Sequence, residues 1–416
     1  MKVFKFGGAS VKNADAVKGL VKILNGYNEN LVVVVSAMGK TTDLLETLVK
    51  AYFEKEETKW EIFNNFKDFH MAVCEQLYEM QSIPASVLKQ FEELENKLHK
   101  APSLDFNFEY DQIVCFGELV STCIVSAFLN SSGKTNQLVD ARSVIRTDYQ
   151  YRDANVNWEL TEKFCRNAFT FNDCQLYVTQ GFIGSTPTNL TTTLGREGSD
   201  YTAAIIGNVL NAESVTFWKD VSGVLSADPK KMKGTIKIDS LSYREAVEMT
   251  HSGAKIIHPK TMKPLHNKGI PLYVKSFLEP ENQGTVIYEI KGKIQHPPIF
   301  ILREHQVLIT LTPKDFSFIN IEDIDRVTKF LVENRIKITL MQQSAIDLNL
   351  VLDAGKPDLK RLIQELSSYY TILYNTGLTL ITIRHYTEEV LDWMVKEKDI
   401  YLEQHSRLTA RMLVKE

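Results

Sequence analysis

The chain has 416 residues, of which 44% are hydrophobic and 24% charged, and its formal net charge is -4. This length predicts one large domain with one or two smaller ones, and the near-average composition excludes wholesale disorder. Lysine and arginine do not gather on one segment, so a nucleic-acid partner is not expected. The N-terminus, MKVFKFGGAS, reaches glycine too early for a signal peptide, and the five cysteines show no CxxC spacing. We therefore expect a soluble cytoplasmic protein with reduced thiols and no membrane partner.

The first elements along the chain follow a strand, loop, helix order. Residues 3–6 form a β-prone run that ends at Gly7-Gly8, and a helical pattern begins after Ser10. Residues 31–35 are continuously apolar and β-branched, which is typical of a strand buried on both faces of a parallel sheet, and a helix is expected near Thr42. Further strands are expected at residues 138–139, 176–179, 215–218 and 272–274. The repeats predict an open, mainly parallel α/β sheet with ligand sites at the carboxyl ends of its strands.

Two segments depart from this pattern. Residues from about 44 to 105 carry long amphipathic patterns, which predict a helical insertion. Glycine and prolines at residues 291–298 mark a linker, and beyond it Leu308–Leu311 is echoed by Leu380–Ile383. We therefore expect a domain over residues 1–290 and two small α+β units over residues 300–416.

Three polar clusters contain residue types that suit a charged ligand. Lys5 precedes the paired Gly7 and Gly8, a turn that lets backbone N–H groups approach a phosphate, although it is not a Walker A loop. Arg196 lies in a glycine-bearing loop and offers a fork for a carboxylate. Residues 218–230 hold lysines and aspartates that suit a nucleotide. The paired glycines alone are weak evidence, and residues 218–230 are equally compatible with a turn. For Arg196, residue type alone favours a solvated arginine in a surface loop.

Taken together, six blocks resemble, in order, the motif series of the aspartate kinase family. They are KFGGAS, VVVVSAMGKTTDLL, FGELVST, TTTLGREGSDYTAA, WKDVSGVLSADPKK and HSGAKIIHPKTM. The match covers about residues 1–285, and the last portion looks like a pair of ACT units. The resemblance implies the amino-acid-kinase fold and the reaction of ATP with L-aspartate to give ADP and 4-phospho-L-aspartate, the first step of the lysine, threonine and methionine pathway.

The resemblance also implies roles for individual residues. Lys5 matches the lysine that stabilises the phosphoryl group in transfer, and Asp200 matches a residue that organises this lysine. Arg196 and Glu118 match the partners of the α-carboxylate and the α-ammonium of aspartate. The other predicted substrate-binding residues are Ser36, Thr42 and Ser199. Glu197 stands where the family loop usually has glycine.

On the nucleotide side, the resemblance implies ATP with Mg²⁺, the ion being held mainly by phosphate oxygens and water, so no protein metal ligand is predicted. The predicted ATP-binding residues are Lys5, Gly7, Gly8, Ser10, Lys219, Asp220, Leu225, Lys230 and Lys255. A homodimer formed through the ACT region is expected by resemblance, and an amino-acid effector is a candidate ligand there.

Two alternatives remain open at this point. One is a kinase for another amino acid, such as glutamate, on the same fold. The other is a non-catalytic or weakly active amino-acid sensor. It stays open because Glu197 replaces a glycine of the family loop, Lys219-Asp220 stands where Thr-Asp is more usual, and Leu225 stands where a tyrosine often lies. Release of ADP in the presence of ATP, Mg²⁺ and L-aspartate distinguishes the aspartate kinase from the sensor.

Overall fold

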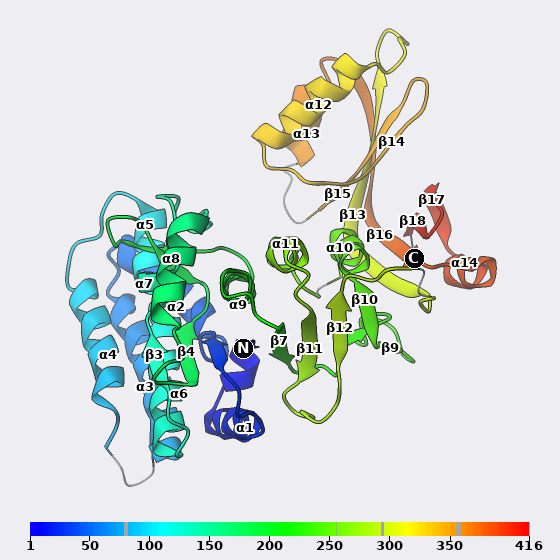
Figure 1. Ribbon diagram of the computed structural model, residues 1–416. Helices are drawn as coiled ribbons and strands as arrows, with labels where there is room; N and C mark the ends of the chain where they lie inside the picture. The colour runs from blue at the N-terminus through cyan, green and yellow to red at the C-terminus, as the bar shows by residue number, and fades with distance from the viewer. Residues whose placement is uncertain (79–81, 255, 293–294, 355–358, 416) are drawn as a thin grey trace. The chain divides into compact units, whose positions relative to one another are not determined.

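The computed structural model forms two compact units, which we describe separately (Figure 1). It describes residues 1–78, 82–254, 256–292, 295–354 and 359–415. The first unit comprises Met1–Val224, Lys237–Val247 and Ile256–Lys293. The second comprises Leu225–Ile236, Glu248–Lys255 and Ile294–Glu416. The second unit thus includes two short segments that precede the linker predicted at residues 291–298.

The first unit is built on an eight-stranded sheet with the order β10-β12-β11-β7-β1-β2-β4-β3. All its pairings are parallel except that between β11 and β12. The strands are β1 (Lys2–Phe6), β2 (Leu31–Val35), β3 (Gln137–Val139), β4 (Leu176–Gln180), β7 (Ser214–Lys219), β10 (Ser240–Ser242), β11 (Leu272–Ser276) and β12 (Thr285–Tyr288). The predicted open, mainly parallel sheet is confirmed. Every residue of β2 is buried, as its unbroken apolar run predicts.

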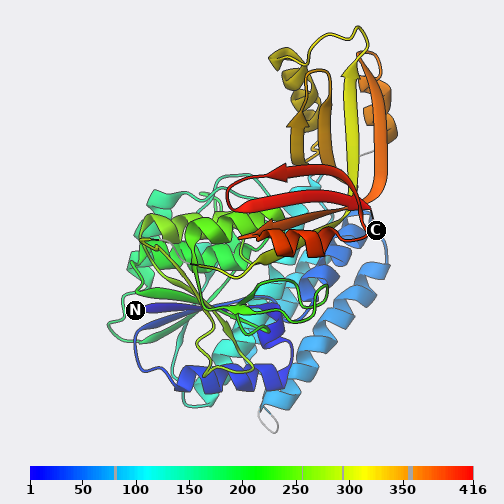
Figure 2. The same ribbon diagram turned by 90° about the vertical axis from the view of Figure 1, so that its right-hand side faces the viewer.

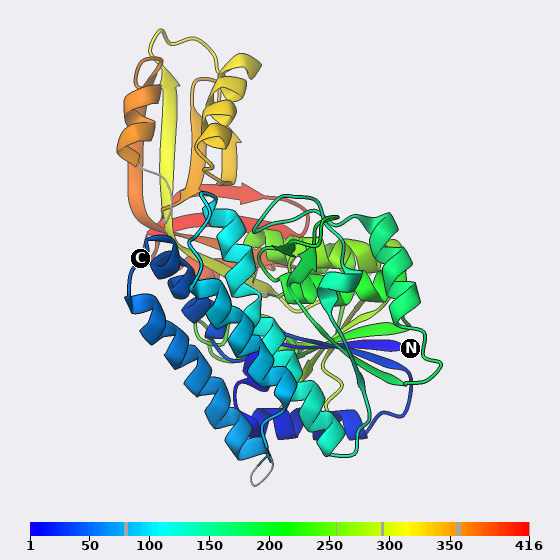
Figure 3. The same ribbon diagram turned by 90° about the vertical axis from the view of Figure 1, so that its left-hand side faces the viewer.

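Helices cover both faces of this sheet, with α1 (Ala14–Asn25) on one face and α9 (Gly198–Val209) on the other (Figures 2 and 3). Helix α6 (Phe116–Ser131) packs on β2, β3 and β4. The remaining helices of this part of the chain are α7 (Ala141–Val144), α8 (Trp158–Ala168), α10 (Tyr243–Ser252) and α11 (Pro259–Asn267). Short strands β5 (Ile183–Ser185) and β6 (Thr191–Thr193) form a separate antiparallel pair, and β8 (Val224–Leu225) and β9 (Lys237–Ile238) are shorter still.

Helices α2 (Thr41–Phe53), α3 (Thr58–Tyr78) and α4 (Ala85–Leu98) occupy most of the described residues in the stretch expected to be a helical insertion, about residues 44 to 105. Helix α5 (Phe106–Val114) begins just after that stretch. Helices α5 and α6 together form one run, Phe106–Ser131, that is long and apolar enough to cross a membrane by length and composition. Its apolar window is 83% buried inside the protein, however, so the run acts as a core element of the fold.

The structure defines where three helices begin. Residues after Gly7 first form a single 3-10 turn, η1 (Gly8–Val11), and α1 begins only after Asn13, whose side chain accepts a hydrogen bond from the Ala16 N–H. The helix expected near Thr42 is confirmed, since α2 begins at Thr41. Helix α9 begins at Gly198, so Ser199 and Asp200 lie in its first turn and not in the preceding loop.

The second unit contains a six-stranded antiparallel sheet with the order β14-β15-β13-β16-β18-β17. Its elements are β13 (Ile299–Pro313), α12 (Ile321–Glu333), β14 (Ile338–Gln343), β15 (Leu348–Asp353), α13 (Leu359–Leu366), β16 (Tyr370–Arg384), α14 (Glu388–Val395), β17 (Asp399–His405) and β18 (Thr409–Lys415). One core packs under α12 and α13, and another packs under α14. The two α+β units expected from the repeat are therefore present. They share one sheet because β13 and β16, each 15 residues long, pair along most of their length.

Candidate active site

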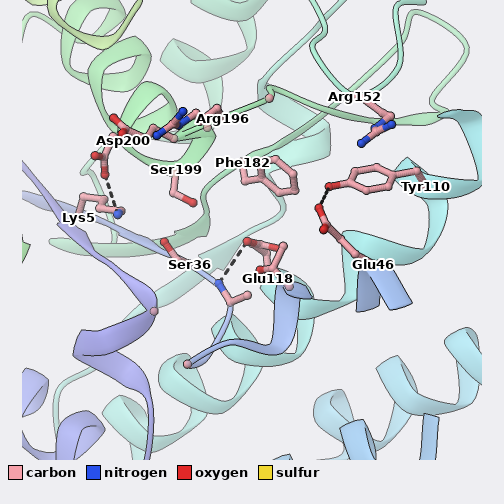
Figure 4. A pocket seen from close by; sticks show the side chains of 17 residues that line it. Lys5, Ser36, Glu46, Tyr110, Glu118, Arg152, Phe182, Arg196, Ser199 and Asp200 are labelled. Carbon is pink, nitrogen blue, oxygen red and sulfur yellow. Dashed lines mark hydrogen bonds and ion pairs between the residues drawn. The ribbon is translucent and has the colours of Figure 1, made fainter. Parts of the chain in front are cut away.

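A pocket of about 530 Å³ opens at the carboxyl ends of β1 and β2 in the first unit. It is lined by the end of β1, the loop after β2, helices α2, α5 and α6, and the loop that leads into α9 (Figure 4). The predicted residues that line it are Lys5, Gly8, Ser36, Thr42, Glu118, Arg196, Ser199 and Asp200. Residues nearly 200 positions apart in the sequence thus meet at the edge of a parallel sheet where ligand sites are expected.

Lys5 and Asp200 form a buried ion pair in this pocket. The Lys5 Nζ lies 2.6 Å from Oδ1 of Asp200, and the Nζ of Lys219 lies 3.8 Å from Oδ2 of the same carboxylate. Burial alone would raise the pKa of Asp200, but the two ammonium groups outweigh this effect and lower its pKa below the ordinary value. Asp200 is therefore a fixed anion that holds Lys5 in place.

The paired glycines make room for this arrangement. A Cβ atom at Gly8 would lie 2.7 Å from the Gly39 carbonyl oxygen and 2.9 Å from that of Ala37. A Cβ atom at Gly7 would lie 3.2 Å from the Nζ of Lys5. Glycine at these positions lets the loop after β2 approach closely and leaves the ammonium group free to turn toward the pocket.

Glu118 has a buried carboxyl group, and only one of its two oxygens has a hydrogen-bond partner among the described residues. Its Oε1 accepts a hydrogen bond of 3.2 Å from the Ala37 N–H, while Oε2 has no hydrogen-bond partner among the described residues. The side chain belongs to the first turn of α6 and its residue is 3% exposed. Burial raises the pKa of Glu118 to about 8, although the Ala37 N–H and the nearby Lys5 act in the opposite direction. A cationic ligand group in the pocket would supply the missing partner.

Arg196 lies on the loop that precedes α9, with an exposed side chain. Among the described residues no carboxylate lies within 4.0 Å of its guanidinium group, so the fork is available to a ligand. The neighbouring Glu197, which has a φ of 55°, directs Oε2 to the His258 N–H at a distance of 2.8 Å. His258 is the residue before α11, so this carboxylate caps that helix and anchors the Arg196 loop to it.

Some predicted nucleotide-binding residues lie elsewhere. The Ser10 hydroxyl is buried and donates a 2.9 Å hydrogen bond to the Trp218 carbonyl oxygen, and neither Ser10 nor Gly7 lines the pocket. Asp220 lines another pocket of about 970 Å³, which lies between α1 and residues 275–281. Leu225 and Lys230 belong to the second unit, and Lys255 lies outside the described residues.

The pocket also contains residues that the motifs did not indicate. These are Glu46, Tyr110, Arg152 and Phe182. Ala37, Gly39 and Gly195, which lie within the quoted motifs, line the pocket as well. Two of these residues have left-handed backbones, with a φ of 71° at Arg152 and 69° at Phe182. Residues with a Cβ rarely adopt this conformation, and such strain gathers at functional sites. Sequence offers no signal for it, because arginine and phenylalanine do not favour left-handed φ.

Comparisons with known proteins agree with this arrangement. The model of the amino acid kinase family matches residues 1–276. The lysine-sensitive aspartokinase 3 of Escherichia coli K12 is 30% identical over 393 residues, which cover 92% of this chain and 86% of that protein. A bifunctional aspartokinase/homoserine dehydrogenase of Arabidopsis thaliana is 30% identical over 293 residues, but the chain spans only 32% of its length.

The solved structures agree as well. The crystal structure of E. coli aspartokinase III in complex with aspartate and ADP superposes with a TM-score of 0.83 at 28% identity, and the match covers 100% of this chain and 96% of that one. A second E. coli structure, in complex with lysine and aspartate, matches with the same TM-score. The fold, the pocket and these relatives together place the chain in the amino acid kinase family, among the aspartokinases.

Proposed function

We propose that this protein transfers the γ-phosphoryl group of ATP to the side-chain carboxylate of L-aspartate, giving ADP and 4-phospho-L-aspartate. The observation that carries this assignment is the charge pattern of one pocket, in which a held ammonium group, a partly unpaired buried carboxyl group and an available guanidinium group line the same space. A zwitterionic acid requires fixed cations and a fixed anion in such an arrangement. The E. coli relative bound to aspartate and ADP supports the same substrates.

In the proposed reaction the protein acts by positioning and charge stabilisation, because phosphoryl transfer needs little covalent help. Lys5, held by Asp200, stabilises the negative charge that spreads over the transferring group. The carboxylate of Glu118 accepts hydrogen bonds from the α-ammonium group of aspartate, and the guanidinium group of Arg196 binds the α-carboxylate. Ser36, Thr42 and Ser199 are proposed to donate hydrogen bonds to substrate or phosphate oxygens from the same pocket.

For the nucleotide, we propose that Lys5, Gly7 and Gly8 face the phosphates and that Lys219 and Asp220 follow toward the nucleoside. Ser10, Leu225, Lys230 and Lys255 remain proposed contributors by resemblance. Mg²⁺ would neutralise phosphate charge. Among the described residues, no group of three or more histidine, cysteine, aspartate or glutamate side chains is placed to hold a metal ion.

We further propose that residues 1–290 form the catalytic domain and residues 300–416 the regulatory region of a cytoplasmic homodimer. Strands β14 and β17 are the two edges of the second unit's sheet, and Met341, Ile400 and Tyr401 on them are exposed. Unpaired strand edges of this kind join sheets between chains. Light scattering on the full chain checks the proposal, because a monomeric mass at assay concentrations would contradict it.

The activity is tested by a coupled assay of ADP release with ATP and Mg²⁺, run with L-aspartate and L-glutamate in parallel, with and without lysine, threonine and methionine. We expect turnover with aspartate and little with glutamate. Turnover with glutamate alone would favour the other kinase, and absence of turnover with either acid would favour the non-catalytic sensor.

Replacing Arg196 by alanine is expected to raise the aspartate KM by roughly ten- to a hundredfold, because a charge-assisted fork is lost, while the ATP KM changes little. Steady-state kinetics with each substrate varied in turn measures both constants. Arg166→Ala is a matched control, since that arginine is on the exposed side of α8 and pairs with Glu162. Equal effects of Arg196→Ala on the two KM values would count against a carboxylate-binding role.

A further inference from the structure

Arg152 is a second guanidinium group in the proposed active-site pocket. It lines the pocket together with Lys5, Glu118 and Arg196, although it comes from the loop between α7 and α8 (Figure 4). No carboxylate of the described residues lies within 4.0 Å of its guanidinium group, and its one side-chain hydrogen bond, to Oδ1 of Asn107, is long at 3.5 Å. The pocket thus contains a cation that the fold does not neutralise.

The backbone of Arg152 is held in place by a buried carboxylate. Its N–H donates to both oxygens of Asp111, at 3.2 and 3.0 Å. Asp111 is fully buried and also accepts hydrogen bonds from the N–H and the hydroxyl of Thr193, at 2.9 and 2.7 Å. These contacts maintain a φ of 71°, which glycine would adopt with less strain. Backbone strain at a residue that lines a pocket points to a function of its side chain.

The side chain rests on an aromatic platform. The guanidinium carbon of Arg152 lies 4.4 Å from the centroid of the Tyr110 ring. Tyr110 is 8% exposed, and its hydroxyl donates a 2.6 Å hydrogen bond to Oε1 of Glu46. A cation–π contact of this kind holds the guanidinium group without using its N–H donors, which stay free for a planar acceptor such as a carboxylate.

The order of charges along the pocket matches an acidic amino acid. Figure 4 shows Lys5 and Arg152 at opposite ends, Glu118 between them, and Arg196 on the side of Asp200 and Ser199. In aspartate a carboxylate, an ammonium group and a second carboxylate follow one another along the molecule. We propose that Arg152 contacts the α-carboxylate of the amino-acid substrate from the end of the pocket opposite Lys5, while Arg196 contacts it from the side of Asp200 and Ser199, and that Arg152 thereby selects substrates in which this group is free. The proposal rests on the function proposed above.

The sharpest test is the variant Arg152→Gly, because glycine suits the left-handed backbone while the whole side chain, including its guanidinium group, is removed. We expect an unchanged or higher melting temperature, an unchanged ATP KM and an aspartate KM raised by about tenfold or more. Lys55→Gly is the matched control, since Lys55 is exposed, has a φ of 60° and does not line the pocket. It should leave both KM values unchanged.

A second substrate separates recognition from a structural effect. The α-amide of L-aspartate keeps the ammonium group and the side-chain carboxylate but lacks the α-carboxylate charge, so its KM should not change in Arg152→Gly. An unchanged aspartate KM, or equal increases for aspartate and its α-amide, would overturn the proposal.

Binding of L-aspartate measured by calorimetry needs no turnover, so it tests Arg152 separately from the kinase activity. We expect weaker binding to Arg152→Gly than to the unmodified protein. If the unmodified protein binds aspartate but releases no ADP, the proposed function fails while the role of Arg152 is still decided. Equal affinities would reject that role.

Discussion

Replacing Lys5 by alanine is expected to lower kcat by on the order of a thousandfold or more, to the point that turnover is lost, while the protein stays folded. Lys5 is the ammonium group that the fold directs into the pocket, and its 2.6 Å ion pair with Asp200 fixes its position. Its loss removes positive charge at the point where negative charge develops in the transition state. Stopped assays at saturating aspartate and ATP measure the effect directly.

The control for Lys5→Ala comes from the same strand. Lys2, at the other end of β1, pairs with Glu29 at 2.5 Å and does not line the pocket, so Lys2→Ala should leave kcat unchanged. Because Lys5→Ala leaves the Asp200 carboxylate with a weaker partner, its melting temperature should fall, and circular dichroism checks that it folds. A folded Lys5→Ala protein with near-normal kcat would refute the assigned role.

The second large expected effect is the release of a proton from Glu118 when aspartate binds. With a pKa near 8, its carboxyl group is mainly protonated at pH 7 in the free protein, whereas a bound α-ammonium group favours the carboxylate. Aspartate binding at pH 7 should therefore release about one proton and should tighten as the pH rises toward the pKa. Calorimetry in two buffers with different ionisation enthalpies measures this number. Binding without net proton release would contradict the assignment.

Glu118→Gln provides the matched variant. The substitution keeps the size of the side chain but removes the anion, so proton release should disappear and the aspartate KM should rise by roughly a hundredfold or more. The pKa of Glu118 is about 8 in the folded protein and has the ordinary value of 4.5 in the unfolded chain. Between these two pH values the unfolded chain loses the proton while the folded protein keeps it, so the free energy of unfolding falls as the pH rises from about 4.5 to about 8. Glu118→Gln should therefore raise the melting temperature at pH 8 and not at pH 4. Parallel losses of stability at both pH values would argue against a buried, ligand-facing carboxyl group.

Much of the fold could be predicted because the pattern of apolar residues along the chain indicates which faces of a strand or helix are buried. The continuous run at residues 31–35 indicated a strand buried on both faces, and β2 is that strand. The start of α9 could not be found in the same way, because Gly198, Ser199 and Asp200 are poor helix formers in sequence. Their position in its first turn depends on tertiary contacts, including the close packing of Gly198 against Phe182.

Some residues of the site could be predicted from the sequence, and others could not. Lys5, Glu118 and Arg196 belong to motifs that resemble a known family, and the structure gathers them in one pocket. Arg152 and Tyr110 belong to no motif. They reach the pocket because the buried Asp111 ties the loop between α7 and α8 to the strand β6, a contact between positions that sequence spacing does not connect. The role of Ser10 in nucleotide binding was assigned by resemblance, and in the structure its hydroxyl donates a hydrogen bond to the Trp218 carbonyl oxygen instead.

The central claim is that this pocket presents the side-chain carboxylate of aspartate to the γ-phosphate of ATP beside Lys5. An acyl phosphate reacts with hydroxylamine to give a stable hydroxamate, so its formation can be measured next to ADP release. The account predicts that the protein, given ATP, Mg²⁺ and L-aspartate, forms the side-chain hydroxamate of aspartate in a one-to-one ratio with ADP. ADP release that does not depend on aspartate, or that yields no hydroxamate, would contradict it.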